Sequence, residues 1–517
     1  MTTLQCGIAM LPFLVFYTFS IIRSLHMFQL NSYKPATHFR WLRKNVACFL
    51  PGTVGAAFCA AAMLRWGWGF CVALTAVFAL LAFFAKPKKA KKPLVYTMRA
   101  IRMLVTTALI TVLAFLVWPI TADPRAFLGV AGTLSLCSPV IILVSNWINQ
   151  PVELSIRRYC IADAKKRLKS SPGLITIGVT GSYGKTSVKY ILSTLLQAQY
   201  NVLMTPESYN TPMGVVITIR NFLRPTHEIF VCEMGARHVG DIKELCDIVH
   251  PDHGIITSVG PQHLETFHTL DNVKKTKFEL ADALPEGGTV FVNGEDENIR
   301  SCTRPAGQRV IRYGLSSACT YYASDISCSS RGTSFTAHTP DGETAVITAR
   351  LIGAHNVINI MGAIAVCCEM GIPLEKLKIQ AKKLESVPHR LQLIRQGGNL
   401  LIDDAYNSNP SGARAAIDAL ALFDGYKILI TPGMVELGEK QAELNRAFGA
   451  YAAKVCDYVI LVGSRPDILD GLLSENYDPE KIYTAKDIQD ALAKAYQRDP
   501  NGQEKIILLE NDLPDNY

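Results

Sequence analysis

The chain has 517 residues, of which 49% are hydrophobic, and a formal net charge of +8. At about 150 residues per domain, this length holds three or four domains. Residues 1–150 hold 14 Lys and Arg but a single acid, Asp123, whereas the remainder holds 38 Lys and Arg and 43 acids. The basic charge therefore belongs to an apolar N-terminal region, and the sequence predicts no nucleic-acid partner. The 14 cysteines include no C-x-x-C pair, which favours buried, reduced thiols over a disulfide scaffold.

Five stretches of the N-terminal region carry no charged side chain, and each is long enough to cross about 30 Å of hydrocarbon as a helix. They are residues 1–22, 45–64, 66–85, 103–122 and 126–152. The first lacks a basic start and a small-residue cleavage site, so we predict a span and not a signal peptide. The second and third are separated only by Arg65 and form a tight hairpin or a re-entrant pair. We therefore predict a multi-span α-helical membrane domain of about five helices over residues 1–150.

Basic residues predict the orientation of these spans. Lys and Arg cluster after the first, third and fifth stretches, whereas the other two loops carry only Arg65 and Arg125. The positive-inside rule places the N-terminus outside and everything after residue 150 in the cytoplasm. The basic, aromatic loop 29–44 would attract anionic lipid at about 1 kcal/mol per Lys or Arg. The spans serve either as an anchor or partner-docking surface, or in handling a lipid-linked phosphate substrate.

A glycine-rich loop, T-G-S-Y-G-K-T-S at residues 180–187, follows an apolar run at 174–179 and precedes a helical pattern at 188–197. Strand, loop and helix N-terminus together make a phosphate cradle. Lys185 would reach the terminal phosphates, and the Thr186 hydroxyl would ligate Mg²⁺. Gly178 lies one residue too early for G-x-x-x-x-G-K-[ST], so the loop is a shorter variant. The predicted nucleotide-binding residues here are Gly181, Ser182, Gly184, Lys185, Thr186 and Ser187.

Residues 151–386 alternate apolar runs with helical patterns. Strands are predicted at 174–179, 228–232, 254–259 and 288–292, and helices at 188–197, 241–248 and 273–284. This is the pattern of a doubly wound α/β domain with a parallel sheet, here a P-loop-type ATPase domain.

Three residues near the ends of these strands are candidates for the site. Glu233 follows the second strand, at the edge where a carboxylate usually holds Mg²⁺. His263 follows the third strand and could ligate a second metal or bond a phosphate, although a lone His is more often structural. Lys277 lies in the first turns of a helix, where a lone Lys is usually a solvated surface residue.

Residues 387–517 predict a second, smaller α/β domain of Rossmann-like shape. Its strands are predicted at 400–403, 427–431, 458–462 and 505–509, and its helices at 411–422, 439–454 and 486–495. The proline-containing segment 387–390 is the predicted hinge between the two domains.

A series of motifs in order, over about residues 172–465, resembles the Mur ligases, the ATP-dependent amide-forming enzymes of bacterial cell-wall synthesis. Within that family the resemblance is to the members that add D-Ala-D-Ala to UDP-MurNAc-tripeptide. The motifs are T-G-S-Y-G-K-T-S, Y-N-T-P-M-G at 209–214, C-E-M-G-A at 232–236, G-P-Q-H-L-E at 260–265, K-x-x-K-F-E at 274–279, G-A-H-N-V-I-N at 353–359, V-P-H-R-L at 387–391, D-D-A-Y-N-S-N-P at 403–410 and G-M-V-E-L-G at 433–438.

The resemblance implies ATP and two Mg²⁺ ions as cofactors and adds roles for single residues. Lys185, His263 and Lys277 would be catalytic, and Lys277 would carry a carbamate that holds the second Mg²⁺. Thr186 and Glu233 would be metal ligands together with His263 and Lys277. The implied nucleotide contacts outside the loop are Asn210, His355, Asn356, Asn359, Arg390 and Asp404.

Two departures from the family affect substrate recognition. Membrane spans stand where the family has its UDP-sugar-binding domain, and Glu510-Asn511-Asp512 replaces a Lys-Gly-Ser-Arg-like turn after the last strand. Both make a soluble UDP-linked substrate doubtful, and neither concerns ATP.

The resulting prediction is an ATP-dependent amide ligase on the cytoplasmic face of the bacterial inner membrane. It would activate a carboxylate of a cell-envelope precursor, lipid-linked or membrane-associated, as an acyl phosphate and add an amino acid or dipeptide. The alternatives are a membrane polyglutamate-type synthase subunit and a non-catalytic ATP-binding scaffold for cell-wall ligases.

Overall fold

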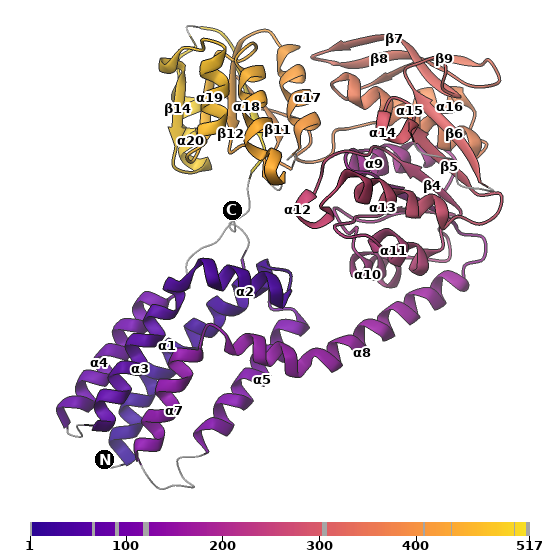
Figure 1. Ribbon diagram of the computed structural model, residues 1–517. Helices are drawn as coiled ribbons and strands as arrows, with labels where there is room; N and C mark the ends of the chain where they lie inside the picture. Colours follow the sequence, from indigo (N-terminus) through magenta and orange to yellow (C-terminus); the bar gives the residue numbers. More distant parts are fainter. Residues whose placement is uncertain are drawn as a thin grey trace. The chain divides into compact units, whose positions relative to one another are not determined.

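The computed structural model describes residues 3–64, 68–87, 93–116, 124–301, 308–406, 409–435, 437–500 and 502–512. The chain forms two compact units, a helical unit within Met1–Arg158 and an α/β unit over Tyr159–Asp512 (Figure 1). Helix α8 (Ile141–Lys169) begins in the helical unit and ends in the α/β unit. Each unit has a hydrophobic core of its own.

The helical unit consists of apolar helices that pack in pairs. Helix α1 packs against α4, and α3 packs against α7. A Cβ atom at Gly52 on α3 would collide with the carbonyl oxygen of Ser135 on α7, so glycine lets these two helices approach closely. The bounds are α1 (Thr3–Leu30), α2 (Pro35–Lys44), the 3-10 helix η1 (Val46–Phe49), α3 (Leu50–Leu64), α4 (Trp68–Ala85), α5 (Met98–Phe115) and α7 (Pro124–Cys137).

The predicted count of five membrane spans is not confirmed. Among the described residues, three helical stretches are long and apolar enough to cross a membrane, namely Met10–Leu30, Val46–Leu64 and Met98–Phe115. The predicted stretch 126–152 is broken, because α7 and α8 meet at an 83° bend that contains Pro139, and the pair counts as a fourth span only if taken together. The predicted stretch 66–85 contributes the shorter apolar helix Val72–Ala85.

The larger sheet of the α/β unit has nine strands in the order β2-β3-β1-β4-β5-β6-β7-β8-β9. Pairs up to β6–β7 are parallel, and β7–β8 and β8–β9 are antiparallel. The strands are β1 (Ile175–Thr180), β2 (Val202–Met204), β3 (Ile229–Glu233), β4 (His253–Ile256), β5 (Thr289–Asn293), β6 (Arg309–Gly314), β7 (Tyr321–Ser329), β8 (Gly332–His338) and β9 (Thr344–Ala349). The four predicted strands are confirmed as β1, β3, β4 and β5.

Helices cover both faces of this sheet, which confirms the predicted α/β class. One hydrophobic core contains residues of α9 (Lys185–Leu196), α15 (Ala354–Glu369) and α16 (Leu374–Ala381). The other contains residues of α10 (Pro212–Phe222), α11 (Asp241–Val249) and α13 (Leu270–Asp282). The short helices α12 (Leu264–Phe267) and α14 (Glu297–Arg300) follow the carboxyl ends of β4 and β5.

The smaller sheet has six strands in the order β10-β11-β15-β12-β13-β14, parallel except for the β10–β11 pair. The last strand in sequence therefore lies in the middle of the sheet. The strands are β10 (Gln392–Gln396), β11 (Asn399–Asp404), β12 (Tyr426–Thr431), β13 (Tyr458–Val462), β14 (Ile482–Ala485) and β15 (Lys505–Glu510). The helices are α17 (Pro410–Ala421), η2 (Gly438–Lys440), α18 (Gln441–Ala452), α19 (Pro466–Ser474), η3 (Pro479–Lys481) and α20 (Ile488–Gln497).

Candidate functional site

The glycine loop lies between β1 and the N-terminus of α9, as the sequence predicts. Gly184 precedes the first turn of α9 with a φ of +78°, and the unpaired N–H groups of that turn face away from the helix. Lys185 Nζ donates to the carbonyl oxygens of Gly181 at 2.6 Å and Ser182 at 3.0 Å. Burial lowers the pKa of Lys185 to about 8, the Glu233 carboxylate opposes this shift, and the Arg390 cation adds to it. The ammonium group is thus held on the loop, ready for an anion.

Hydrogen bonds join the loop to the segment that follows β4. Ser182 N–H donates to the carbonyl of Ser258 at 2.8 Å, and the Ser182 hydroxyl donates to the carbonyl of Gly260 at 3.0 Å. Tyr183 N–H donates to Ser258 Oγ at 2.7 Å. The Ser182 side chain is therefore already engaged in holding the loop, although the sequence analysis assigns it to the nucleotide.

Replacing Gly181 by alanine is expected to lower the rate of ADP formation from ATP by about 10²-fold. This is the usual cost of displacing the reacting groups by about 1 Å. The φ of Gly181 is +153°, and a Cβ atom there would collide with Thr257 Oγ1 and push the loop from the 257–260 segment. Gly173→Ala is the matched control, since a Cβ atom at Gly173 meets no atom within 4 Å. A coupled ADP assay measures both variants, and equal rates would contradict the expected collision.

Glu233, at the end of β3, is the centre of a buried polar cluster. Its Oε1 accepts hydrogen bonds from Thr186 Oγ1 at 3.2 Å and Asn210 Nδ2 at 3.0 Å. Its Oε2 lies 3.0 Å from Lys189 Nζ, and both of these side chains are buried. A hydroxyl and a carboxylate side by side at a phosphate loop are oxygen donors that fit Mg²⁺, which keeps several of its other ligands as water or phosphate. The sequence analysis missed Lys189; its place one helical turn after Lys185 was the available signal.

His263 and Lys277 lie outside the cluster around Glu233. His263 has a φ of +53°, and its carbonyl caps α12 by accepting from the N–H groups of Thr266 and Phe267. Lys277 is buried on α13, with Nζ 5.9 Å from the centre of the Phe267 ring. Burial lowers the pKa of Lys277 well below its usual value, and the nearby Lys185 cation lowers it further. Lys277 is therefore not the solvated surface residue that such a lysine usually is. Among the described residues, no three His, Cys, Asp or Glu side chains form a metal-binding group.

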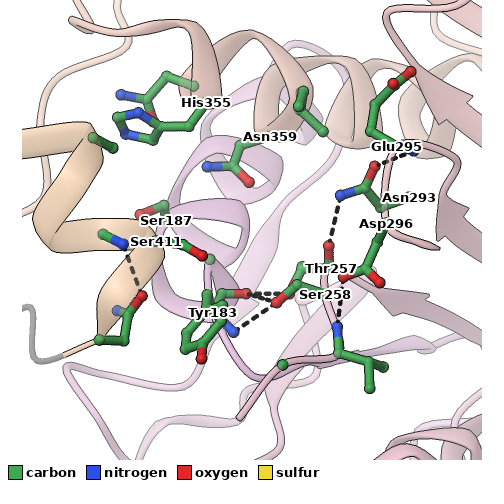
Figure 2. Close-up of a pocket in the computed structure, with 18 of the residues that line it drawn as sticks. Tyr183, Ser187, Thr257, Ser258, Asn293, Glu295, Asp296, His355, Asn359 and Ser411 are labelled. Atoms are coloured by element: carbon green, nitrogen blue, oxygen red, sulfur yellow. Dashed lines mark hydrogen bonds between the residues drawn. The ribbon is translucent and has the colours of Figure 1, made fainter. Parts of the chain in front are cut away.

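A cavity of about 550 Å³ opens beside the glycine loop (Figure 2). It brings together seven predicted residues, Gly184, Ser187, His355, Asn356, Asn359, Arg390 and Asp404. A Cβ atom at Gly184 would lie 3.1 Å from Asn359 Oδ1, so glycine leaves room for this amide beside the loop. The lining does not include the other predicted residues, which are Gly181, Ser182, Lys185, Thr186, Asn210, Glu233, His263 and Lys277. The predicted site is therefore one nucleotide-sized cavity with a separate buried cluster next to the loop.

The wall formed by the carboxyl end of β5 was missed by the sequence analysis. Asn293 Nδ2 donates to the carbonyl of Thr257 at 3.0 Å, and Asp296 Oδ2 accepts from Val259 N–H at 2.8 Å. Both side chains point at segment 257–259, which is hydrogen-bonded to the glycine loop (Figure 2). The available signal was that ligands bind outside the carboxyl ends of parallel strands, which applies to the predicted strand 288–292.

The smaller domain contributes to the cavity through Arg390 and Leu391 before β10, through Asp404 at the end of β11, and through α17 and its cap. Asp404 Oδ1 accepts from Leu391 N–H at 3.1 Å, and His389 Nδ1 lies 2.7 Å from Asp403 Oδ2. His389 and Leu391 both have positive φ angles. This tight turn places Arg390 in the cavity lining, where its positive charge helps to lower the pKa of Lys185.

His355 is expected to make the stability of the protein fall at acidic pH. Burial lowers its pKa to about 4 from an ordinary 6.5. As the pH falls, the unfolded state therefore takes up the proton at a higher pH than the folded state does. Stability then falls as pH drops from about 6.5 to about 4. In His355→Gln, circular dichroism melting at a series of pH values should show a shallower fall over this window. If the melting temperature fell equally steeply with pH in the wild type and in His355→Gln, the lowered pKa of His355 would not be the cause.

Comparisons with known proteins agree with this geometry. A family model described as "Mur ligase middle domain" matches residues 179–367, and one described as "Mur ligase, glutamate ligase domain" matches residues 389–509. A UDP-N-acetylmuramoyl-tripeptide–D-alanyl-D-alanine ligase of Escherichia coli is 30% identical over 62% of this chain and 72% of its own. One of Haemophilus influenzae is 30% identical over 68% and 77%. The solved structure of the MurF ligase of Thermotoga maritima in complex with ADP has 26% identity and a TM-score of 0.61 over 69% of this chain and 80% of its own.

Proposed function

Because the chain belongs to the Mur ligase family, whose members are ATP-dependent, ADP-forming C–N ligases, we propose that it adds an amino acid or a short peptide to a carboxylate of a peptidoglycan precursor. The observation that carries this proposal is the cavity beside the glycine loop. There Gly184 and Ser187 from α9 and its cap meet Arg390 and Asp404 from the smaller domain. The size and the mixture of cationic, amide and hydroxyl groups suit a nucleoside triphosphate.

The proposed reaction has two steps. An oxygen of the substrate carboxylate attacks the γ-phosphorus of ATP, the bond from that phosphorus to the bridging oxygen breaks, and ADP leaves an acyl phosphate behind. The nitrogen of the amine then attacks the acyl carbon, phosphate leaves, and the nitrogen loses a proton. Because an acyl phosphate hydrolyses readily, the two domains must exclude water while it exists.

The proposed roles follow from charge and position. Lys185 would stabilise the charge on the transferring phosphoryl group. Thr186 and Glu233 would hold Mg²⁺, which neutralises phosphate charge when bound, and His263 would serve a second ion. The buried position of Lys277 favours its neutral amine, which is the form that reacts with CO₂ to give the carbamate implied by the family resemblance.

We also propose that the helical unit spans the bacterial inner membrane and leaves the ligase domains in the cytoplasm. The proposed boundaries are 1–150 for the membrane domain, 151–386 for the central domain and 387–517 for the C-terminal domain. The three apolar helices and the basic loops support this location. If the full chain stayed in the soluble fraction after cell lysis without detergent, the proposed location would be wrong.

The test of function is a substrate matrix with the purified full chain in detergent. A UDP-linked muropeptide and a lipid-linked muropeptide are each combined with single amino acids and with D-Ala-D-Ala, the dipeptide in the names of the curated relatives. We expect ADP release only when a carboxylate and an amine are both present, and a product one addition heavier by mass spectrometry. A ladder of masses would favour the polyglutamate-type synthase, and the absence of ADP with every pair would favour the scaffold.

A further inference from the structure

Helix α2 is amphipathic and lies between the two apolar stretches Met10–Leu30 and Val46–Leu64. Its inner face packs on α1 through His38, which is fully buried and lies 5.0 Å from the Phe28 ring, centre to centre. Its outer face exposes Phe39, at 56% of its surface, together with Arg40 and Arg43. A helix of this kind rests in the plane of a membrane interface, with its apolar residues toward the acyl chains.

In the part of the chain that the structure describes, the arginines around α2 have no counter-ion. Residues 1–152 contain one acid, Asp123, and the next, Glu153, is paired with Arg102 at 2.7 Å. Within the described part of the chain, the side chains of Arg23, Arg40 and Arg43 make no ion pair and no hydrogen bond. Among the described residues, the helical unit therefore offers these arginines no carboxylate partner, and an anionic ligand could balance their charge.

Two hollows flank α2, and their lining indicates what kind of anion would bind there. An open groove is lined by Pro35, Ala36, Phe39, Arg40, Arg43 and Leu143. A smaller cavity of about 50 Å³ reaches from Arg23 past Trp41 to Pro139, at the bend between α7 and α8. The groove therefore presents two guanidinium groups, at positions i and i+3, beside an apolar wall. Guanidinium groups pair well with phosphate. A ligand without a hydrocarbon part would leave the apolar wall exposed to water, so the groove favours a ligand that has both parts.

We propose that the groove on α2 binds the phosphate head group of an anionic phospholipid of the surrounding bilayer. Arg40 and Arg43 bind the phosphate, Phe39 and Leu143 contact the upper part of the acyl chains, and Arg23 adds positive charge from the other side of α2. This site lies outside the proposed ligase site and rests only on the membrane location in the proposed function.

The experiment titrates the detergent-solubilised full chain with fluorescent phosphatidylglycerol. At about fivefold per arginine, Arg40→Gln/Arg43→Gln should bind about 25-fold more weakly than the wild type. Arg125→Gln is the matched control, because Arg125 lies at the other end of α7, about 20 Å from the bend. It should stay within twofold of the wild type. Glycerol 3-phosphate, a head group without acyl chains, should bind at least tenfold more weakly than the lipid in every protein.

Three results would overturn the proposal. They are unchanged lipid affinity in the double variant, an equal loss in Arg125→Gln, and preferential binding of polyprenyl phosphate over phosphatidylglycerol. The melting temperature and the ADP release of each variant are measured in the same preparations. Since Arg40 and Arg43 lie on the surface, both should match the wild type. Wild-type ADP release with lost lipid binding supports the lipid site, whereas an inactive wild type would count against the proposed function alone.

Discussion

Lys185→Ala is expected to lower the rate of ADP formation by about 10²–10³-fold, the usual cost of removing one group that stabilises transition-state charge. The Nζ of Lys185 donates to the carbonyls of Gly181 and Ser182, and a phosphate would attract it away from them. With a pKa of about 8 it is still mostly protonated at neutral pH. A coupled assay of ADP release with saturating substrates measures the effect.

Lys275→Ala is the control for this variant, because Lys275 is an exposed lysine on α13. Its rate should equal that of the wild type. If Lys185→Ala released ADP at the wild-type rate, the prediction that the glycine loop and Lys185 bind the phosphates of ATP would be wrong. Nucleotide affinity, measured separately by calorimetry with ADP, tells whether the loss is in binding or in phosphoryl transfer.

Lys189→Met is expected to destabilise the α/β unit by about 3–5 kcal/mol, because it leaves the buried Glu233 without its ion-pair partner. The side chain of Lys189 is 0% exposed and that of Glu233 is 1% exposed, at a separation of 3.0 Å. Adding Glu233→Gln to Lys189→Met should recover part of the loss, since no buried charge is then left unpaired. The double variant is expected to be inactive, because it lacks the proposed metal ligand Glu233.

The matched control is Lys454→Met. Lys454 pairs with Glu475 at 3.4 Å, but the two side chains are 58% and 38% exposed, so the expected cost is below about 1 kcal/mol. All five tryptophans of the chain lie before residue 150, so their fluorescence does not report on the α/β unit. Hydrogen exchange of α9 and β3 in the full chain is the suitable measurement. Equal protection in Lys189→Met and wild type would show that the pair is not stabilising.

The parts of the site that sequence predicts are those with local signals. The glycine loop shows itself through a strand before it, a helix after it and glycines between, and Glu233 through its place at a strand end. Lys189 lies one helical turn after Lys185, but this spacing alone does not predict that its side chain is buried, because a lysine in a helix is usually exposed. It is buried only because β1 and β3 pair and bring Glu233, 44 positions later, against α9.

The fold shows the same division between local and non-local information. Runs of apolar residues predict the central parallel strands, which are buried on both faces. The antiparallel strands β7 to β9 alternate buried and exposed positions and contain many Ser and Thr, so they give no comparable run. In the helical unit, the absence of charge predicts one continuous stretch at 126–152, whereas the helix breaks between Cys137 and Ile141, where Pro139 cannot donate a backbone hydrogen bond.

The central position of β15 has a consequence for biosynthesis. Strands β11 and β12 both pair with β15 and not with each other, so residues 399–431 have no complete sheet to join while the ribosome is still adding residues 432–504. The smaller domain therefore folds only after residues 505–510 have been translated. A prematurely terminated chain would expose two unpaired strand edges, which cellular proteases and chaperones recognise readily. Incomplete copies would thus be removed before they could compete with full-length protein for substrate.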